Sequence, residues 1–218
     1  MQGQTIFDEL ARHAIIPVIA IDDINTALPL ADALLEGGLP VLEITFRTTA
    51  AQAVLEKLSS DRPELLLGAG TVLTEENARI AKESGARFAV APGLNPKVVE
   101  CAHAVGLPFA PGIATPSDVE GALALGCSVM KFFPAGALGG GPYIKAMAAP
   151  YSHLGIRFIA TGGINEENLA AYLSLPSVPA VGGTWIAQKA DVVAGRWKAI
   201  SARCAKAVAT VRVLRGMP

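Results

Sequence analysis

Short apolar runs recur along the whole chain, and this repetition limits the folds that are open to it. Turn residues follow each run, and amphipathic stretches such as 74–86 and 95–107 lie between them. The runs begin roughly 20 to 29 residues apart, which is the size of a minimal unit of one strand and one helix. The eight runs are residues 15–21, 40–46, 65–72, 88–93, 108–114, 128–135, 157–164 and 178–185.

Eight alternations of a buried strand with a helix predict an α/β fold, the closed (β/α)8 TIM barrel. The competing architecture is a doubly wound open sheet, which usually has fewer strands and a glycine fingerprint after its first strand. In this chain the glycine pairs come late, as Gly162–Gly163 and Gly182–Gly183 after the seventh and eighth runs. We therefore expect residues 1–218 to form a single barrel domain.

Helices are expected between the runs and at both ends of the barrel. Three of them are bounded by a polar N-cap and a glycine, with Thr74, Asn95 and Ser117 as the predicted caps. Residues 5–14 are predicted to form an extra N-terminal helix across the bottom of the barrel. In the tail that begins at Asp191, apolar side chains recur at helical spacing, which predicts a helix packed on the barrel wall. These side chains are Trp197, Ile200, Cys204, Val208 and Val211.

Composition and charge argue against several classes of protein. With 51% hydrophobic residues and no polar linker, the chain suits one well-buried domain. A net charge of −1 lacks the basic excess of a nucleic-acid binder. The N-terminus carries Asp8 and Glu9 without an apolar segment, and no run approaches the roughly 18 residues of a membrane helix, so we expect neither a signal peptide nor a membrane partner. Three widely spaced cysteines, Cys101, Cys127 and Cys204, are expected to be buried free thiols in a cytoplasmic protein.

Two charged residues are predicted to point into the barrel. Glu43 in the second run and Lys131 in the sixth each lie between two bulky apolar neighbours, which are expected to face the helices. Successive strand residues point to opposite faces, so Glu43 and Lys131 face the interior. Their strands are four apart in the ring, which places the carboxylate and the amine roughly across the barrel from each other.

A buried ion pair with a purely structural role is the alternative interpretation of Glu43 and Lys131. Such a pair is a weak stabiliser, because desolvating both charges costs several kcal/mol. The functional interpretation is an amine kept uncharged, since an apolar strand and a nearby cation such as Arg47 both favour that form. An uncharged amine forms a Schiff base with a ketone, and a nearby carboxylate can move protons during dehydration and carbon–carbon cleavage.

The two late glycine pairs indicate a phosphate site. Gly162–Gly163 precede a predicted helix that begins near Asn165, and Gly182–Gly183 precede Thr184. Glycine allows backbone N–H groups to approach a phosphate closely, and the N-terminus of a helix adds a favourable dipole. Barrel enzymes often bind phosphate on the loops that follow strands seven and eight. Two such turns in the last two units therefore predict a phosphorylated ligand.

These motifs together resemble the KDPG and KHG aldolases, the family that acts on 2-keto-3-deoxy-6-phosphogluconate and 4-hydroxy-2-oxoglutarate. The resemblance spans about residues 5–212 and rests on "PVIAI", "GLPVLEITFRT", "GAGTVL", "APGL", "PGIATPSD", "MKFFPA", "TGGI" and "GGTW". It implies a class I aldolase that needs no metal and no cofactor, assembled as a homotrimer. Its implied reaction is the cleavage of 2-dehydro-3-deoxy-6-phosphogluconate to pyruvate and D-glyceraldehyde 3-phosphate, the Entner–Doudoroff reaction.

The resemblance also implies roles for individual residues. Lys131 matches the Schiff-base lysine and Glu43 the general acid/base. Arg47 and Thr71 match residues that hold the pyruvyl carboxylate, and Thr161 matches a residue near the substrate hydroxyls. Pro92 and Phe133 match apolar groups at the pyruvyl end. The phosphate loops match Gly162, Gly163, Gly183 and Thr184, and we include the neighbouring Gly182 in the predicted phosphate site.

The chain departs from the family at two positions, and three competing functions stay open. Relatives commonly carry Ser at the position of Thr184 and an acidic residue at the position of Gly136.

Galactonate-type relatives carry an apolar residue where this chain has Thr161, so the hydroxyl favours the gluconate epimer over the galactonate one. The late glycine turns also suit a phosphate-binding isomerase or epimerase that acts by proton transfer alone, or a non-catalytic barrel that senses sugar phosphates. Cleavage of 4-hydroxy-2-oxoglutarate is a further expected activity.

Overall fold

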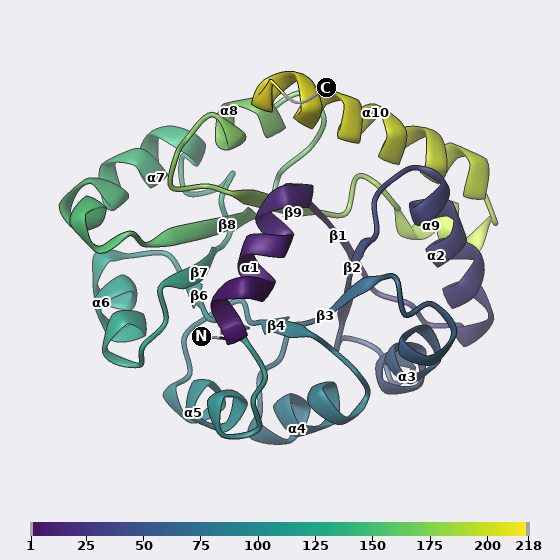
Figure 1. Cartoon of the computed structure of the whole chain (residues 1–218), viewed down its shortest axis with the longest axis horizontal. Helices are drawn as coiled ribbons and strands as arrows, with labels where there is room; N and C mark the ends of the chain where they lie inside the picture. The colour runs from purple at the N-terminus through teal and green to yellow at the C-terminus, as the bar shows by residue number, and fades with distance from the viewer. Residues whose placement is uncertain (1, 217–218) are drawn as a thin grey trace.

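The computed structural model describes residues 2–216, with side chains from Ile6 onward. Its parallel strands form one sheet in the order β5-β4-β3-β2-β1-β9-β8-β7-β6, and helices surround this sheet on the outside (Figure 1). The predicted barrel is therefore confirmed. The strands are β1 (Ile15–Ile19), β2 (Val41–Thr45), β3 (Leu66–Gly70), β4 (Phe88–Val90), β5 (Phe109–Ala110), β6 (Gly112–Ile113), β7 (Val129–Phe132), β8 (Arg157–Thr161) and β9 (Ala180–Gly183).

The fifth apolar run forms two short strands instead of one, because Pro111 interrupts it. Proline has no N–H to donate to a neighbouring strand. β5, before the proline, pairs with β4, whereas β6, after it, pairs with β7. The carbonyl of Pro111 still accepts a hydrogen bond of 2.8 Å from the N–H of Lys131. Since β5 and β6 are consecutive in the chain, this run joins both ends of the sheet and closes the barrel.

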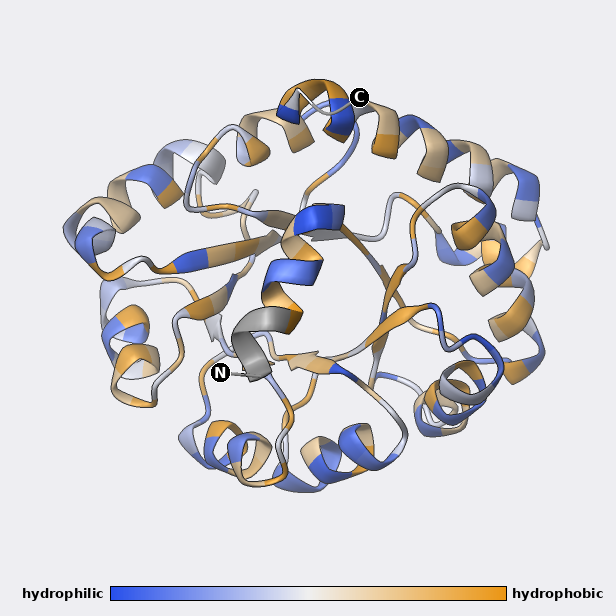
Figure 2. Ribbon diagram, viewed as in Figure 1, coloured by the Kyte–Doolittle hydropathy of each residue, from blue (hydrophilic) through white to orange (hydrophobic). Residues whose placement is uncertain are grey.

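The helices carry both hydrophilic and hydrophobic residues (Figure 2), and most of the residues that they bury are apolar. This is the amphipathic pattern that the sequence shows between its apolar runs. The helices are α1 (Gln2–His13), α2 (Ala27–Glu36), α3 (Ala51–Asp61), α4 (Glu75–Glu83), α5 (Pro96–Ala104), α6 (Pro116–Ala124), α7 (Gly140–Ala148), α8 (Leu169–Leu173), α9 (Lys189–Val193) and α10 (Trp197–Arg215), with short 3-10 turns at Ile24–Thr26 and Ala149–Leu154.

Two of the three predicted N-caps are confirmed, and the third is wrong. The side chains of Thr74 and Asn95 accept backbone hydrogen bonds at the starts of α4 and α5. The cap of α6 is Thr115 and not Ser117, because Thr115 forms a capping box with Asp118. Pro116 occupies the first turn, where its missing N–H costs nothing, so the helix begins before Ser117.

The helix expected near Asn165 begins later than predicted, at Leu169. The side chain of Asn165 accepts hydrogen bonds from the N–H groups of Glu167 and Asn168, at 2.9 and 3.1 Å. In return, Oδ1 of Asn168 accepts from the N–H of Asn165 at 2.9 Å. Side-chain bonds of this kind compete with helical ones, so the segment forms a turn before the helix.

Two groups of buried apolar side chains stabilise the barrel. One group fills the barrel interior and includes Val41 and Val129, together with Phe7 and Leu10 of α1. α1 lies across one mouth of the barrel, as predicted (Figure 1). Because Phe7 and Leu10 belong to the interior group, α1 packs on the core at that end. The other group lies between the strands and the outer helices. Leu42, Ile44, Met130 and Phe132 belong to the outer group, so the predicted strand parity is confirmed.

The C-terminal helix α10 packs on the outside of the barrel through the predicted stripe. Ile200, Cys204 and Val211 are buried, and α10 lies against α2, α8 and α9. The three cysteines are buried free thiols, as predicted. Burial raises the pKa of Cys127 to about 11 and that of Cys204 to about 12, which favours inert thiols.

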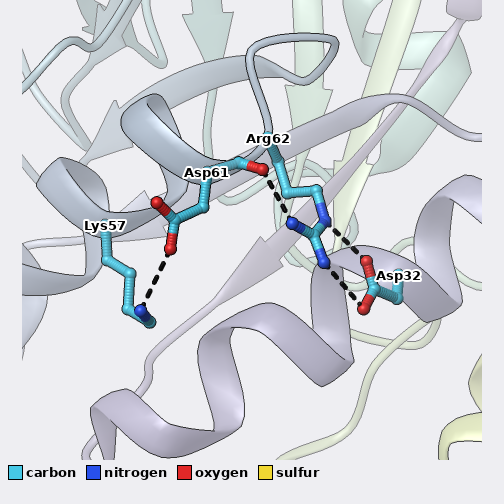
Figure 3. A network of polar contacts seen from close by, with 4 residues as sticks. All are labelled: Asp32, Lys57, Asp61 and Arg62. Atoms are coloured by element: carbon cyan, nitrogen blue, oxygen red, sulfur yellow. Dashed lines mark hydrogen bonds and ion pairs between the residues drawn. The ribbon is translucent and has the colours of Figure 1, made fainter.

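A surface network joins α2 to the end of α3 (Figure 3). Arg62 makes two hydrogen bonds to Asp32, of 2.6 and 3.0 Å, and also donates to the carbonyl of Asp61. Lys57 pairs with Asp61 at 3.0 Å, and this bond is the main cause that lowers the pKa of Asp61. The bidentate Arg62–Asp32 pair fixes one outer helix to the next, although exposed pairs of this kind are worth little energetically.

Candidate active site

The two predicted catalytic side chains meet inside the barrel. Nζ of Lys131 lies 3.3 Å from Oε1 of Glu43, with both residues buried. Lys131 comes from β7 and Glu43 from β2, and both strands direct these side chains inward, toward the end where the strands lead into the helices. The ring of Phe133 lies beside the amine, with its centroid 6.0 Å from Nζ. The arrangement is an amine in contact with one carboxylate and with an apolar wall.

Gly70 provides the space for the Glu43 carboxylate. Gly70 ends β3, where it pairs in register with Thr45 of β2. A Cβ atom at this position would overlap Oε1 of Glu43. Any other residue at position 70 would therefore displace the carboxylate that contacts Lys131.

Arg47 lies just beyond the end of β2, where a hydrogen bond at the Nε edge orients its guanidinium. Its Nε donates a hydrogen bond of 3.0 Å to Oγ1 of Thr45, which is buried. Arg47 itself is exposed and makes no ion pair with any side chain that the structure describes. The cation is therefore oriented at the mouth of the barrel without being neutralised.

Thr71 follows β3 in a conformation that threonine rarely adopts. Its φ is +58°, in the left-handed region, where a β-branched residue is a genuine outlier. The neighbouring bonds hold it there, since Gly70 accepts from the N–H of Phe46 and Val72 donates to Val90. Strain of this kind gathers at functional sites, where the surrounding structure enforces it.

Pro92 and Phe133, the predicted apolar contacts, are half-buried and follow β4 and β7. Gly112 of β6 packs directly against the backbone of Pro92, because a Cβ atom on Gly112 would overlap the Pro92 carbonyl. Phe133 faces both Lys131 and the turn at Gly162, where an added Cβ would lie 3.1 Å from its ring. The structure thus brings Phe133 to the amine.

The hydroxyl of Thr161 is buried without a partner. Thr161 ends β8 and is 4% exposed, and its Oγ1 makes no hydrogen bond to any of the residues that the structure describes. Its neighbour across the sheet is Gly182, where a Cβ atom would lie 2.7 Å from the Thr161 methyl group. Leaving a buried hydroxyl unsatisfied costs about 1–3 kcal/mol, so packing alone does not explain a threonine here.

The predicted phosphate glycines lie in and after the last two strands. Gly162 and Gly163 adopt φ values of +92° and +79°, which non-glycine residues rarely reach. Gly182 is buried within β9, Gly183 ends the strand, and Thr184 is exposed beyond it. Within residues 2–216, the N–H groups of Gly163 and Thr184 donate to no other protein group. Both remain free for a ligand at the rim.

The described residues contain no group of three or more His, Cys, Asp or Glu side chains placed to hold a metal ion. In the same part of the chain, no helix combines the length and the hydropathy that a membrane span requires.

Comparison with known proteins identifies the family. The family description "KDPG and KHG aldolase" matches residues 6–203. A relative named 2-dehydro-3-deoxy-phosphogluconate aldolase, from Haemophilus influenzae, is 45% identical over 90% of this chain and 92% of its own. The KHG/KDPG aldolase of Escherichia coli is 38% identical over 91% of this chain and 92% of its own. The chain belongs to the KDPG and KHG aldolase family.

A solved structure of one family member shares this fold. The KDPG aldolase of Legionella pneumophila superposes with a TM-score of 0.88 at 38% identity, over 95% of this chain and 98% of its own. That crystal holds pyruvate captured at low pH as a covalent carbinolamine. As a family member, the present chain is an aldolase, a carbon–carbon lyase.

Two residues of the site were missed by sequence reasoning. The segment "GAGTV" drew attention to Thr71, whereas the space that Gly70 provides depends on a side chain from another strand. Thr45 is two positions from Glu43, so alternation along the strand gives both the same inward face, but its bond to Arg47 is visible only in the structure. A threonine at the end of an apolar run, two residues before an arginine just past that run, was the available signal.

Proposed function

We propose that this aldolase cleaves 2-dehydro-3-deoxy-6-phosphogluconate to pyruvate and D-glyceraldehyde 3-phosphate through a Schiff base on Lys131. The single observation that supports this most strongly is the buried contact of 3.3 Å between Lys131 and Glu43. A buried ion pair is a poor stabiliser, so two charges inside the barrel at its functional end are better explained by catalysis.

The proposed course begins with attack of the Lys131 amine on the keto carbon of the substrate. The resulting carbinolamine loses water to become an iminium ion, with Glu43 moving the protons. The iminium accepts the electron pair of the C3–C4 bond as that bond breaks, while the C4 hydroxyl loses its proton and becomes the aldehyde. Protonation of the enamine and addition of water then release pyruvate and the free lysine.

Binding groups surround this centre. We assign the substrate carboxylate to Arg47 and Thr71, since a guanidinium can bind a carboxylate through two parallel hydrogen bonds. Pro92 and Phe133 would line the apolar side of the pyruvyl group. The phosphate is assigned to Gly162, Gly163, Gly182, Gly183 and Thr184. The free N–H groups of Gly163 and Thr184 support this last assignment.

Thr161 supports the gluconate epimer as the preferred substrate. Its buried, unpartnered hydroxyl is positioned to bond a substrate hydroxyl of one configuration. A site built for such a bond rejects a ligand that leaves it unmade. The galactonate epimer is the alternative, and 4-hydroxy-2-oxoglutarate is a further proposed substrate. A side-by-side assay of product formation from these three compounds measures the preference.

Borohydride reduction in the presence of pyruvate tests the proposal. The wild-type chain should gain one pyruvyl-sized adduct, located on Lys131 by peptide mass spectrometry. Lys131→Met should remove both the adduct and aldol cleavage while the protein remains folded. Lys145→Met, which changes an exposed lysine on α7, is the matched control and should behave as wild type.

An isomerase or epimerase that uses proton transfer alone would form no adduct, and a sensor would bind sugar phosphates without making product. Normal cleavage by Lys131→Met, or the absence of an adduct on the wild-type chain, would refute the Schiff-base scheme.

The proposal includes assembly as a homotrimer in the cytoplasm, on the strength of the family resemblance. Leu73 is 51% exposed just beyond Thr71, and an oligomer could cover such an apolar side chain. Light scattering coupled to size-exclusion chromatography measures the assembly, and a mass of one chain would argue against the trimer.

A further inference from the structure

Thr45 is a buried polar residue to which the proposed chemistry assigns no role. It ends β2 with an exposed fraction of 1%, on the same inward face as Glu43. Valine has nearly the same shape, suits a buried strand equally well and brings no hydroxyl to desolvate. Packing therefore does not explain why this position carries a hydroxyl group.

Both hydrogen-bonding functions of the Thr45 hydroxyl are used. It donates to the carbonyl of Ile19 in β1, at 3.3 Å, and accepts from Nε of Arg47, at 3.0 Å. A threonine hydroxyl has one hydrogen to donate and lone pairs to accept with. The bond to Ile19 therefore orients the hydroxyl so that its lone pairs face Nε of Arg47.

This bond decides which edge of the guanidinium remains available. A carboxylate can approach arginine either from the side, through Nε and one Nη, or end-on, through both Nη atoms. In this structure Nε is occupied by Thr45, and Arg47 has no ion-pair partner among the described side chains. Only the end-on pair of donors is left for a ligand at the barrel mouth.

We infer that Thr45 is a positioning residue for substrate binding, which holds Nε of Arg47 so that the two Nη atoms meet the substrate carboxylate end-on. This inference rests on the function proposed above, in which Arg47 binds the carboxylate. Thr45 does not touch the substrate. It limits the rotation of a long, exposed side chain that would otherwise lose considerable rotamer freedom when a ligand binds.

Thr48 offers a matched control. Its hydroxyl donates 2.6 Å to the carbonyl of Ile21, in the segment that follows β1, just as Thr45 donates to Ile19. It makes no bond to Arg47. Thr48→Val therefore removes a comparable hydrogen bond to the neighbouring segment and leaves the guanidinium as it is.

The experiment measures the pyruvate concentration that gives half-maximal borohydride trapping, together with kcat and KM for the phosphorylated substrate. Thr45→Val should raise the half-trapping concentration and KM about tenfold, which is the loss expected for one hydrogen bond to a charged group. Its kcat should change much less, because the carboxylate is held in both the ground state and the transition state. Thr45→Ser should restore wild-type values, and Thr48→Val should not depart from them.

A double-mutant cycle with Arg47→Lys separates the positioning of the guanidinium from a general disturbance of the site. Lysine has no Nε–H to donate to Thr45. In that background Thr45→Val should have no further effect on KM. If valine at position 45 prevents folding, Thr45→Ala removes the same hydroxyl without adding bulk, and the same values are expected of it.

The inference is wrong if Thr45→Val, or Thr45→Ala in its place, needs the same pyruvate concentration as wild type for half-maximal trapping. It is equally wrong if the effects of the Thr45 and Arg47 substitutions on KM are additive in the double mutant. Failure of the wild-type chain to trap pyruvate would instead refute the proposed aldolase function, so the two failures are distinguishable.

Discussion

Nζ of Lys131 and Oε1 of Glu43 lie 3.3 Å apart inside the barrel, although 88 residues separate them in the chain. Each residue is held by a strand whose other face packs against the outer helices. The positions of the amine and the carboxylate are therefore set by the barrel core. This rigidity makes the effects of nearby substitutions predictable.

Glu43→Gln should slow the reaction while the site keeps its shape. Glutamine has nearly the same volume but cannot exchange a proton with the reacting atoms. We expect kcat to fall by about 10²- to 10⁴-fold, the usual contribution of a general acid/base, with slower formation of the pyruvate adduct on Lys131. Steady-state and trapping kinetics measure both effects. Glu75→Gln, on the exposed face of α4, should keep wild-type rates, and an active Glu43→Gln enzyme would exclude Glu43 as the proton shuttle.

Gly70→Ala should displace the Glu43 carboxylate. Its added methyl group would occupy the position of the Glu43 oxygen that contacts Lys131. A misplacement of about 1 Å can cost about 100-fold in rate, so we expect a loss of that size in kcat. The control is Gly93→Ala, since no atom lies within 4 Å of the Cβ added there. Equal activity of both variants would show that the site adapts to the methyl group.

Thr161→Val should separate stability from activity. The substitution removes a buried hydroxyl that has no partner, so the free energy of unfolding should rise by about 1 kcal/mol. Activity on the gluconate epimer should fall by about tenfold or more, because a substrate hydroxyl loses its partner. Denaturant unfolding and kcat/KM are the two measurements. A variant that is less stable and fully active would show that Thr161 has only a structural role.

Asp118 should make the start of α6 sensitive to acid. Burial by itself would raise the pKa of this carboxyl, but hydrogen bonds from Ala114 and Thr115 outweigh it and hold the pKa below its ordinary value. Because the folded pKa is the lower one, the stabilisation is complete above the unfolded value of about 3.8 and is lost as the pH falls through the folded pKa.

Asp118→Asn should therefore lower the free energy of unfolding by about 1 kcal/mol at pH 7, the usual value of a helix cap. The difference from wild type should shrink below pH 4, where the wild-type carboxyl also becomes protonated. Unfolding curves at pH 7 and pH 3 measure it. A difference that stays constant between these pH values would mean that the charge of Asp118 contributes nothing.

The sequence alone predicted the barrel and the inward direction of Glu43 and Lys131. Both follow from local patterns, since apolar runs at a regular spacing define strand–helix units and alternation along a strand fixes the face of each side chain. Local patterns misplaced the start of α6 and of α8. At Thr115 and Asn165, side-chain hydrogen bonds to nearby N–H groups decided where each helix begins. Composition alone does not distinguish which of several neighbouring polar residues forms such bonds.

What the chain determined by itself was the type of each residue at the mouth of the barrel and the face on which it lies. Only the tertiary structure decided that Gly70 makes room for Glu43, that Thr45 holds Arg47, and that the Thr161 hydroxyl is left without a partner. The physical reason is that strand pairing brings residues from distant parts of the chain to within a few ångströms. Their contacts therefore depend on the register between neighbouring strands, which no single segment specifies.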